Sequence, residues 1–388
     1  MRIPPAPSLR PVAQISPSAY EKMLRCNARA AWSLFGDANS IPLHPKAFLG
    51  TCYHRTIEDA HAGRLRGDDA AARLARAREA FDLHARRLHQ ESHPLVRTKF
   101  PAPERLPYYA LFRERVALHA ASLPERSRQG EDGEGSRLHL QTTRVEARIS
   151  SRDGLVVGRP DLVDPALRQV VDHKTGTVPP PGQPRIRDSE ARQLRLYAHL
   201  AAENGMMVSE GIILRSDGEV AALAVPPEDA AAEGTAARRL LAGFNARAGA
   251  DFASAAQPSP EACLHCPCIP LCEAFWKAAT PTWADGCGIH VEGVIRTVEE
   301  SVVQGTKLKT FGLSITRGTV AVGNNFVEQI PEAWIVADGS ECPKIGEHLR
   351  VTEARVEQER GVVSIRVDRI STTVWSGIPA DTQTPTVR

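Results

Sequence analysis

The sequence lacks the apolar segments that membrane insertion and secretion require. No uninterrupted apolar run approaches the length of about 20 residues that spans a bilayer. The first five residues, MRIPP, also lack the apolar core of a signal peptide. We therefore expect an intracellular, cytoplasmic protein that has no membrane partner.

Net charge is nearly absent as well, since 48 basic residues stand against 46 acidic ones and the formal charge is +2. This balance leaves the partner open, because nucleic-acid binding depends on how charges cluster on one face rather than on their sum. The length of 388 residues and the 42% hydrophobic content are typical of a globular protein with two or three domains. No GxxxxGK[ST] phosphate loop is present, so unwinding of DNA would need a partner.

Cysteines are few, and their number argues against a disulfide scaffold. Only eight occur in the chain, whereas small disulfide-stapled domains are dense in cysteine. Four of the eight are nevertheless close together in the sequence, namely Cys263, Cys266, Cys268 and Cys272. This crowding predicts a metal site, because several thiolates at such spacing can surround one centre.

The order of predicted helices and strands indicates an α/β fold. Serine and proline before residue 19 mark a helix start, and apolar residues at helical spacing continue the helix over 19–35, with Cys26 inside it. A second helix, beginning near residue 50, carries His54. Strands are predicted over 138–149, 155–163 and 169–173, and a further helix over 189–203.

Glycine-rich and polar stretches divide the chain into domains. Residues 127–136, SRQGEDGEGS, predict a flexible surface loop between a helical front and a strand-rich centre. From about residue 285 the sequence becomes rich in Val, Ile and Thr, and this composition predicts a separate small β domain over 285–372. Its last strands resemble those that close an OB-fold barrel, a fold often used on single-stranded nucleic acid. Residues 373–388 predict a disordered tail.

The most informative segment, residues 158–176, reads GRPDLVDPALRQVVDHKTG. It places Asp161 on one predicted strand and both Asp172 and Lys174 on the next. Strand side chains alternate, so Asp172 and Lys174 point to one face, and hairpin pairing can bring Asp161 alongside. Two carboxylates can hold Mg²⁺ or Mn²⁺ for phosphodiester hydrolysis, while Lys174 orients water or stabilises developing charge. Taken alone, the triplet is explained as readily by turn-capping aspartates and a surface lysine.

Gln193 and Tyr197 lie four residues apart on the helix predicted over 189–203. Residues at this spacing share a face, where both side chains can contact a DNA strand. Without the upstream strands, the simpler interpretation would be an ordinary amphipathic helix.

Together these pieces resemble the RecB-like branch of the PD-(D/E)XK nucleases. The matching motifs are LGTCYHRTIE around His54, GRPDLV, VVDHKTG and QLRLYAHL, in the family's order. The resemblance covers about residues 14–278 and implies a restriction-endonuclease-like core, with a mixed central sheet flanked by helices, within residues 1–280. The roles that it implies are metal binding by His54, Asp161 and Asp172, catalysis by Lys174, a backbone carbonyl ligand from His173, and substrate contact by Gln193 and Tyr197. Many relatives also have a glutamate on the first core strand, and Glu146 stands where it is expected.

Cys26 matches the isolated N-terminal cysteine of the cluster-bearing members of this branch, which include CRISPR adaptation nucleases and bacterial recombination nucleases. The resemblance implies a [4Fe-4S] cluster held by Cys26, Cys263, Cys266 and Cys272. The alternative is a local zinc knuckle that uses Cys268 and leaves Cys26 out. A cluster that joins Cys26 to Cys263 would close a loop around nearly the whole nuclease domain, so its first role would be structural.

We therefore expect a metal-dependent deoxyribonuclease that works as an exonuclease or on the ends of single-stranded DNA. Its pathway would be DNA repair or recombination, or antiphage or CRISPR-linked defence, with a helicase or a defence protein as candidate partner. The alternative is a catalytically idle DNA-binding or scaffold subunit of such a complex. The presence of Asp161, Asp172 and Lys174 favours the enzyme, because an idle site has no physical need for all three.

Overall fold

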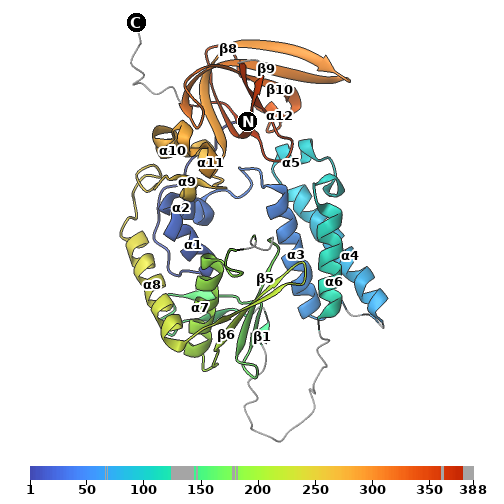
Figure 1. Ribbon diagram of the computed structural model, residues 1–388, viewed down its shortest axis with the longest axis vertical. Coiled ribbons are helices and arrows are strands. Elements are labelled where there is room, and N and C mark those ends of the chain that lie inside the picture. Colours follow the sequence, from blue (N-terminus) through green and yellow to red (C-terminus); the bar gives the residue numbers. More distant parts are fainter. Residues whose placement is uncertain are drawn as a thin grey trace, which may run out of the picture.

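The computed structural model of the protein describes residues 1–65, 67, 69–123, 144–145, 147–176, 180, 182–359 and 362–378. Within these residues, buried apolar side chains form four clusters, which lie in the central sheet, the helical layer beside it, the cysteine segment and the β domain. Figure 1 shows the sheet and the helical layer side by side, with the C-terminal strands across one end of both. No helix in the described part of the chain is long and apolar enough to cross a membrane.

A five-stranded mixed sheet forms the centre of the N-terminal domain, in the order β1-β4-β5-β6-β7. Strand β5 is antiparallel to β4 and parallel to β6, and a parallel pair needs a crossover connection, which α7 supplies. The strands are β1 Arg144–Val145, β4 Leu162–Asp164, β5 Gln169–Lys174, β6 Glu210–Arg215 and β7 Val220–Ala224, with a separate pair β2 Ile149–Ser150 and β3 Val157–Gly158. The predicted α/β class and the mixed sheet flanked by helices are therefore confirmed.

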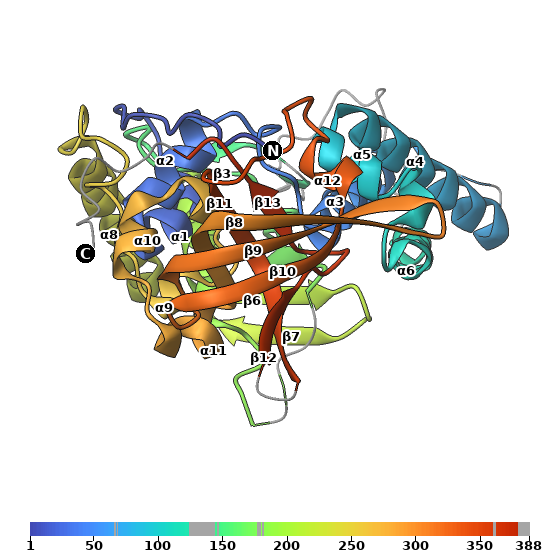
Figure 2. The same cartoon turned by 90° about the horizontal axis from the view of Figure 1, so that it is seen from above.

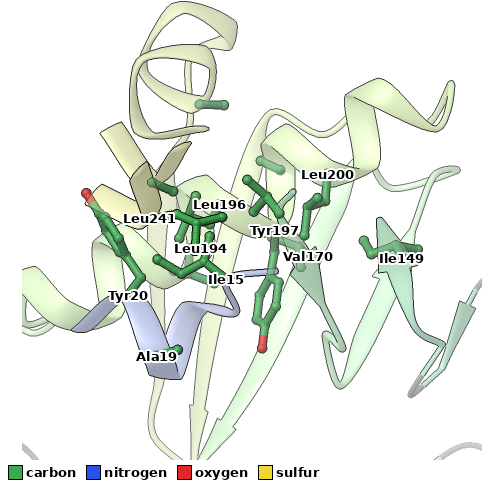
Figure 3. Packing of buried hydrophobic residues seen from close by; sticks show 14 of the residues in the cluster. Ile15, Ala19, Tyr20, Ile149, Val170, Leu194, Leu196, Tyr197, Leu200 and Leu241 are labelled. Atoms are coloured by element: carbon green, nitrogen blue, oxygen red, sulfur yellow. The ribbon is translucent and has the colours of Figure 1, made fainter. Parts of the chain in front are cut away.

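Helix α7 packs against this sheet through a continuous apolar face. Figure 3 shows Leu194 and Leu196 of α7 gathered with Leu241 of α8, and Leu200 directed toward Val170 on β5. The approach is close, since a Cβ at Gly211 on β6 would lie 2.8 Å from the Leu194 side chain. The helices are α7 Asp188–Glu203 and α8 Pro227–Asn245. This packing fixes the height of α7 above β5, where the acidic residues lie.

The structure corrects the single helix that the sequence predicts over 19–35. Two helices occupy this segment, α1 Pro17–Arg25 and α2 Asn27–Phe35, because Cys26 between them is extended, with φ −169° and ψ 124°. The Ser16 hydroxyl accepts a hydrogen bond from the Ala19 N–H, so the predicted serine cap is confirmed. Cys26 thus lies at a bend, and its Sγ accepts from the Gln257 N–H at 3.4 Å.

The helical layer consists of α3 Pro45–His61, α4 Ala70–Glu91, α5 Pro94–Lys99, the 3-10 turn η1 Pro103–Arg105 and α6 Tyr109–Ser122. Helix α3 begins five residues before the predicted start, because the His44 side chain caps it by accepting from the Lys46 N–H. Phe48 and Phe81 are fully buried between α3, α4 and α6. The loop predicted over 127–136 lies outside the described residues.

Short helices connect the N-terminal domain to a six-stranded sheet of order β12-β10-β9-β8-β11-β13 (Figure 2). Strand β12 pairs in parallel with β10 and also antiparallel with β11. The connecting elements are α9 Pro260–Cys263, η2 Ile269–Leu271, α10 Glu273–Ala278, η3 Pro281–Trp283 and α11 Ala284–Cys287. The β domain comprises β8 Ile289–Val303, β9 Thr306–Gly318, β10 Gly323–Pro331, α12 Glu332–Ile335, β11 His348–Glu359, β12 Val362–Arg366 and β13 Thr373–Trp375.

The β domain extends past its predicted end at residue 372. Strand β13 pairs with β11, and Trp375 is fully buried, so residues 373–378 belong to the domain and not to a disordered tail. The chain start lies here too, since the Met1 amino group donates to the Ile335 carbonyl at 2.6 Å (Figure 1). The rest of the predicted tail, 379–388, lies outside the described residues.

A buried ion-pair network ties the β domain to the connecting helices. Glu292 on β8 is fully buried and contacts Arg350 at 2.6 Å and Arg317 at 2.5 Å. Both arginines also contact Glu273 on α10, next to Cys272. The β domain is therefore joined to the cysteine segment by shared ion pairs between two arginines and two glutamates.

Candidate active site

The hairpin of β4 and β5 brings the predicted acidic residues together. Leu162 pairs with Val171, so Asp161 lies one step beyond, beside Asp172. The Asp161 carboxylate accepts a hydrogen bond from the His173 N–H at 2.5 Å. The expectation that pairing aligns the two aspartates is confirmed.

Asp172 and Lys174 point to the same face of β5, as strand alternation predicts. The Lys174 Nζ lies 2.7 Å from the Asp172 Oδ2. Asp172 is only 4% exposed. Burial raises the pKa of this carboxyl above its usual range, while the Lys174 ammonium opposes the rise and Asp161 adds to it. A second positive charge at the site would favour the ionised form of Asp172.

Gln193 on α7 bridges this ion pair. Its Oε1 accepts from the Lys174 Nζ and its Nε2 donates to the Asp172 Oδ1, both at 2.7 Å. The Gln193 Nε2 also lies 3.0 Å from the Tyr197 hydroxyl, which donates to the Arg159 carbonyl at 3.3 Å. Gln193 and Tyr197 therefore share the predicted face of the helix, where they position the site residues.

Helix α3 brings His54 to the same place. Burial lowers the pKa of His54 and the charge of Lys174 adds to this shift, whereas the charges of Asp161 and Glu58 oppose it. A neutral imidazole is the form that binds metal. His54, distant in sequence from the hairpin, is thus within electrostatic reach of Asp161 and Lys174.

A cluster of rings behind β5 was missed by sequence reasoning. On the face opposite Asp172, the His173 ring lies 4.7 Å from the His119 ring and 5.7 Å from the His61 ring, centroid to centroid. The Tyr53 hydroxyl contacts the His119 Nδ1 at 2.5 Å. Burial lowers the pKa of His173 to about 3 and that of His119 to about 4, so both are neutral at pH 7. These ring contacts connect α3 and α6 to β5. In the sequence, the available signal was that His54 and His61 lie seven residues apart, on one face of the same helix.

The predicted roles of Glu146 and of the His173 carbonyl are not tested by the described residues. Glu146 lies outside the described residues. His173 contributes its N–H to Asp161, and its predicted carbonyl contact with metal stays a prediction.

The family model described as "PD-(D/E)XK nuclease superfamily" matches residues 14–273. The chain belongs to the PD-(D/E)XK nuclease superfamily. Members of this superfamily are typically divalent-metal-dependent nucleases. The match includes α3, the β4–β5 hairpin and α7, which carry the residues described above.

Other comparisons add little to this assignment. No curated protein matches the chain. Six solved chains are similar to it. Among them is "Crystal structure of SSO0001", at 13% identity and a TM-score of 0.24, covering 66% of this chain and 96% of that one. Membership of the nuclease superfamily rests on the family model.

The donors at the nuclease site suit a hard divalent cation. In the described residues, no three His, Cys, Asp or Glu side chains already stand in an arrangement that would hold a metal ion. The chemistry of the donors nevertheless fits Mg²⁺ or Mn²⁺, because Asp161 and Asp172 offer carboxylate oxygens and His54 a neutral imidazole. Metal binding by these three residues stays a prediction.

The four cysteines predicted as cluster ligands gather in one place. Cys26, Cys263, Cys266 and Cys272 line a single cavity of about 10 Å³, together with Cys268. All are free thiols. Burial raises the pKa of both Cys263 and Cys272 to about 12, so an added positive centre would be needed to keep them as thiolates. Thiols of this number are the donors that iron–sulfur and zinc centres use, but among the described residues no three of them already stand in an arrangement that would hold a metal ion. The cluster and the zinc site that uses Cys268 both stay predictions.

Proposed function

We propose that this protein is a divalent-metal-dependent deoxyribonuclease of the RecB-like branch. One observation carries the proposal: Asp161, Asp172 and Lys174 meet on the β4–β5 hairpin, beside His54 from α3. Two carboxylates, a neutral imidazole and an ammonium in one place are the groups that metal-assisted phosphodiester hydrolysis uses.

Each residue has a distinct task in this mechanism. Asp161, Asp172 and His54 would hold Mg²⁺ or Mn²⁺, with a further ligand from the His173 carbonyl. When bound, the metal lowers the pKa of its water and offsets negative charge on the phosphate. Lys174 would orient the attacking water or stabilise the charge that develops on the phosphate oxygens.

Gln193 and Tyr197 would align these groups and face the substrate. The two 2.7 Å contacts of Gln193 hold Lys174 and Asp172 at a fixed separation. A fixed separation lowers the cost of reorganisation during the reaction. Glu146, as predicted from the sequence, would add a further carboxylate.

We infer that the β domain is OB-like and holds single-stranded DNA. The strand pairing supports this inference. Within the set of five strands β8, β9, β10, β11 and β12, each strand pairs with two others, and β10 is parallel to β12. Helix α12 follows β10 and precedes β11 in the chain. A five-stranded partly open barrel of this kind commonly binds oligonucleotides. A domain that holds a single strand favours exonucleolytic or end-directed cleavage. Unwinding of the duplex would come from a partner, either a helicase or a protein of a defence system. The pathway would be DNA repair or recombination, or antiphage or CRISPR-linked defence.

The nuclease proposal is tested by DNA cleavage with a matched lysine control. Protein purified without oxygen is incubated with linear and circular, single- and double-stranded DNA and Mg²⁺ or Mn²⁺. We expect Lys174→Ala to lose at least about 100-fold in rate, as for removal of one charge-stabilising group, whereas Arg76→Ala, which removes an exposed cation on α4, keeps full activity. Absence of cleavage under every condition, or equal cleavage by Lys174→Ala, would instead favour a scaffold role.

We propose that a [4Fe-4S] cluster on Cys26, Cys263, Cys266 and Cys272 closes the nuclease domain. The gathering of these thiols around one cavity supports it, since they come from segments more than 200 residues apart. Cys26→Ala should lose the brown colour, the iron and the fold, whereas Cys268→Ala should retain all three. Zinc in place of iron, or colour that survives Cys26→Ala, would contradict this ligand set.

A further inference from the structure

A large cavity lies between the N-terminal domain and the β domain, apart from the nuclease site. Its volume is about 870 Å³, within the range of about 300–1,000 Å³ that ligand pockets occupy. Its walls come from α2, the start of α3, α5, the cysteine segment and residues of β11 and β13. Neither Asp161, Asp172 nor Lys174 lines it.

Four cationic side chains line the cavity without a carboxylate partner within ion-pair distance in the described part of the chain; they are Lys22, Arg29, Lys46 and Lys99. Lys99 is only 4% exposed, and its Nζ donates to the Thr372 carbonyl at 2.6 Å. Burial lowers the pKa of Lys99 to about 8, although the charges of Asp368 and Glu353 oppose this shift. The carboxylate in the described lining is that of Glu353, so the cavity has an excess of positive charge.

Aromatic and aliphatic side chains make up much of the remaining wall. Trp32 and Phe100 line the cavity from α2 and from the end of α5, and at 7% and 3% exposed they present ring edges to it. Sites that bind single strands combine cations for the phosphates with aromatic rings on which bases stack. An acidic peptide would use the cations and has no need of aromatic rings. The composition of the walls therefore favours a nucleic-acid strand.

Helix α3 links this cavity to the nuclease site. Lys46 lines the cavity, and Gly50 lies against Thr175, where a Cβ would be 3.3 Å from the Thr175 hydroxyl. His54, one further turn along, lies within electrostatic reach of Asp161 and Lys174. Positions four apart lie on one face of a helix, so Lys46, Gly50 and His54 share a side of α3. At a rise of about 1.5 Å per residue, Lys46 and His54 are about 12 Å apart, or roughly three to four stacked nucleotides.

We propose that this cavity binds the single-stranded part of the DNA substrate, a few nucleotides from the phosphate that is cut. The proposal rests on the nuclease function proposed above and adds to it the place and the chemistry by which the strand is held. Phosphates contact Lys22, Lys46 and Lys99, and bases lie along the apolar wall to which Trp32 and Phe100 contribute their ring edges.

The cysteine segment forms one wall of this site. Arg29 donates to the carbonyls of Ala262, Leu264 and His265, at 3.2 to 3.3 Å, and so holds the segment in place. Because Arg29 has this structural task and Lys99 is buried, neither is suited to substitution. Lys22 and Lys46 are the residues to test, because within the described residues the side chain of each makes one local contact only, Lys22 with the Ser33 hydroxyl and Lys46 with the Tyr108 ring.

The test measures strand binding without cleavage. The double variant Lys22→Ala/Lys46→Ala is compared with wild type and with a control that removes two exposed cations on α4, outside the cavity lining, Arg76→Ala/Arg86→Ala. Fluorescence anisotropy follows a labelled 20-nucleotide oligothymidylate in EDTA over a range of salt concentrations. Thermal unfolding of each variant checks the fold, and Lys46→Ala alone, with its exposed side chain, serves as a milder variant.

We expect the cavity variant to bind oligothymidylate about 10-fold more weakly, and the slope of log affinity against log salt to fall by about 1.4, or about 0.7 per phosphate contact. Lys46→Ala alone should lose half of that slope, and the control none. Unchanged affinity and slope, an equal loss in the control, an equal loss with a blunt duplex, or binding of oligoglutamate in place of oligothymidylate would each overturn the proposal. Since the assay contains no divalent metal, its outcome is independent of whether Lys174→Ala abolishes cleavage.

Discussion

Replacing Gln193 by leucine should slow DNA cleavage while the fold survives. Gln193 makes two 2.7 Å hydrogen bonds to charged groups, one to Lys174 and one to Asp172. A hydrogen bond to a charged group contributes about 1.5–3 kcal/mol. The direct 2.7 Å contact between Lys174 and Asp172 remains in the variant, so the two losses are partly offset. We expect a total loss of about 1.5–3 kcal/mol in transition-state stabilisation, which corresponds to a rate about 10- to 100-fold lower.

The assay is single-turnover cleavage of a linear single strand at saturating Mn²⁺, with unfolding by urea measured in parallel. Gln169→Leu is the matched control, because Gln169 lies on β5 with Asp172 and Lys174, and its Nε2 donates to Glu210 at 2.6 Å, away from the site. Gln169→Leu should cleave at the wild-type rate. A rate for Gln193→Leu within twofold of wild type, or the same loss in both variants, would refute the view that Gln193 aligns the lysine and the aspartate.

Two further predictions concern stability. Glu292→Gln leaves Arg350 buried beside a neutral partner, so it should lower the free energy of unfolding in urea by about 3–5 kcal/mol. A decrease below about 1 kcal/mol, or an equal decrease in the exposed Glu300→Gln, would count against a stabilising role of the network. His290 is fully buried, its Nε2 contacts the Cys287 carbonyl at 2.9 Å, and burial lowers its pKa to about 4, against about 6.5 in the unfolded chain. The unfolded state therefore binds the proton first, so stability is complete above about pH 6.5 and falls as the pH drops toward 4, by about 2 kcal/mol at pH 5 from this group. His290→Gln should lose about that much less between pH 7.5 and pH 5, and an unchanged difference would exclude His290 as the cause.

Much of the catalytic hairpin was predictable because its geometry is local. Strand alternation alone places Asp172 and Lys174 on one face, and the turn between the strands is short enough for pairing to bring Asp161 alongside. Helical spacing likewise places Gln193 and Tyr197 together. The boundaries of the helices were less predictable: α3 begins earlier than expected through its His44 cap, and Cys26 interrupts the predicted helix over 19–35.

The sequence by itself determined the α/β class, the β4–β5 hairpin with its two aspartates and lysine, and the face of α7 that lies over them, because each follows from the periodicity of a few neighbouring residues. Only the tertiary structure decided what meets across long stretches of chain. It placed His54 near the hairpin, brought the rings of His119 and His61 into contact with that of His173, gathered Cys26 with the distant cysteines, and enclosed a cationic cavity between two domains. Such contacts depend on how whole elements pack, and packing is set by the combined shape of many side chains, which no short window of sequence contains.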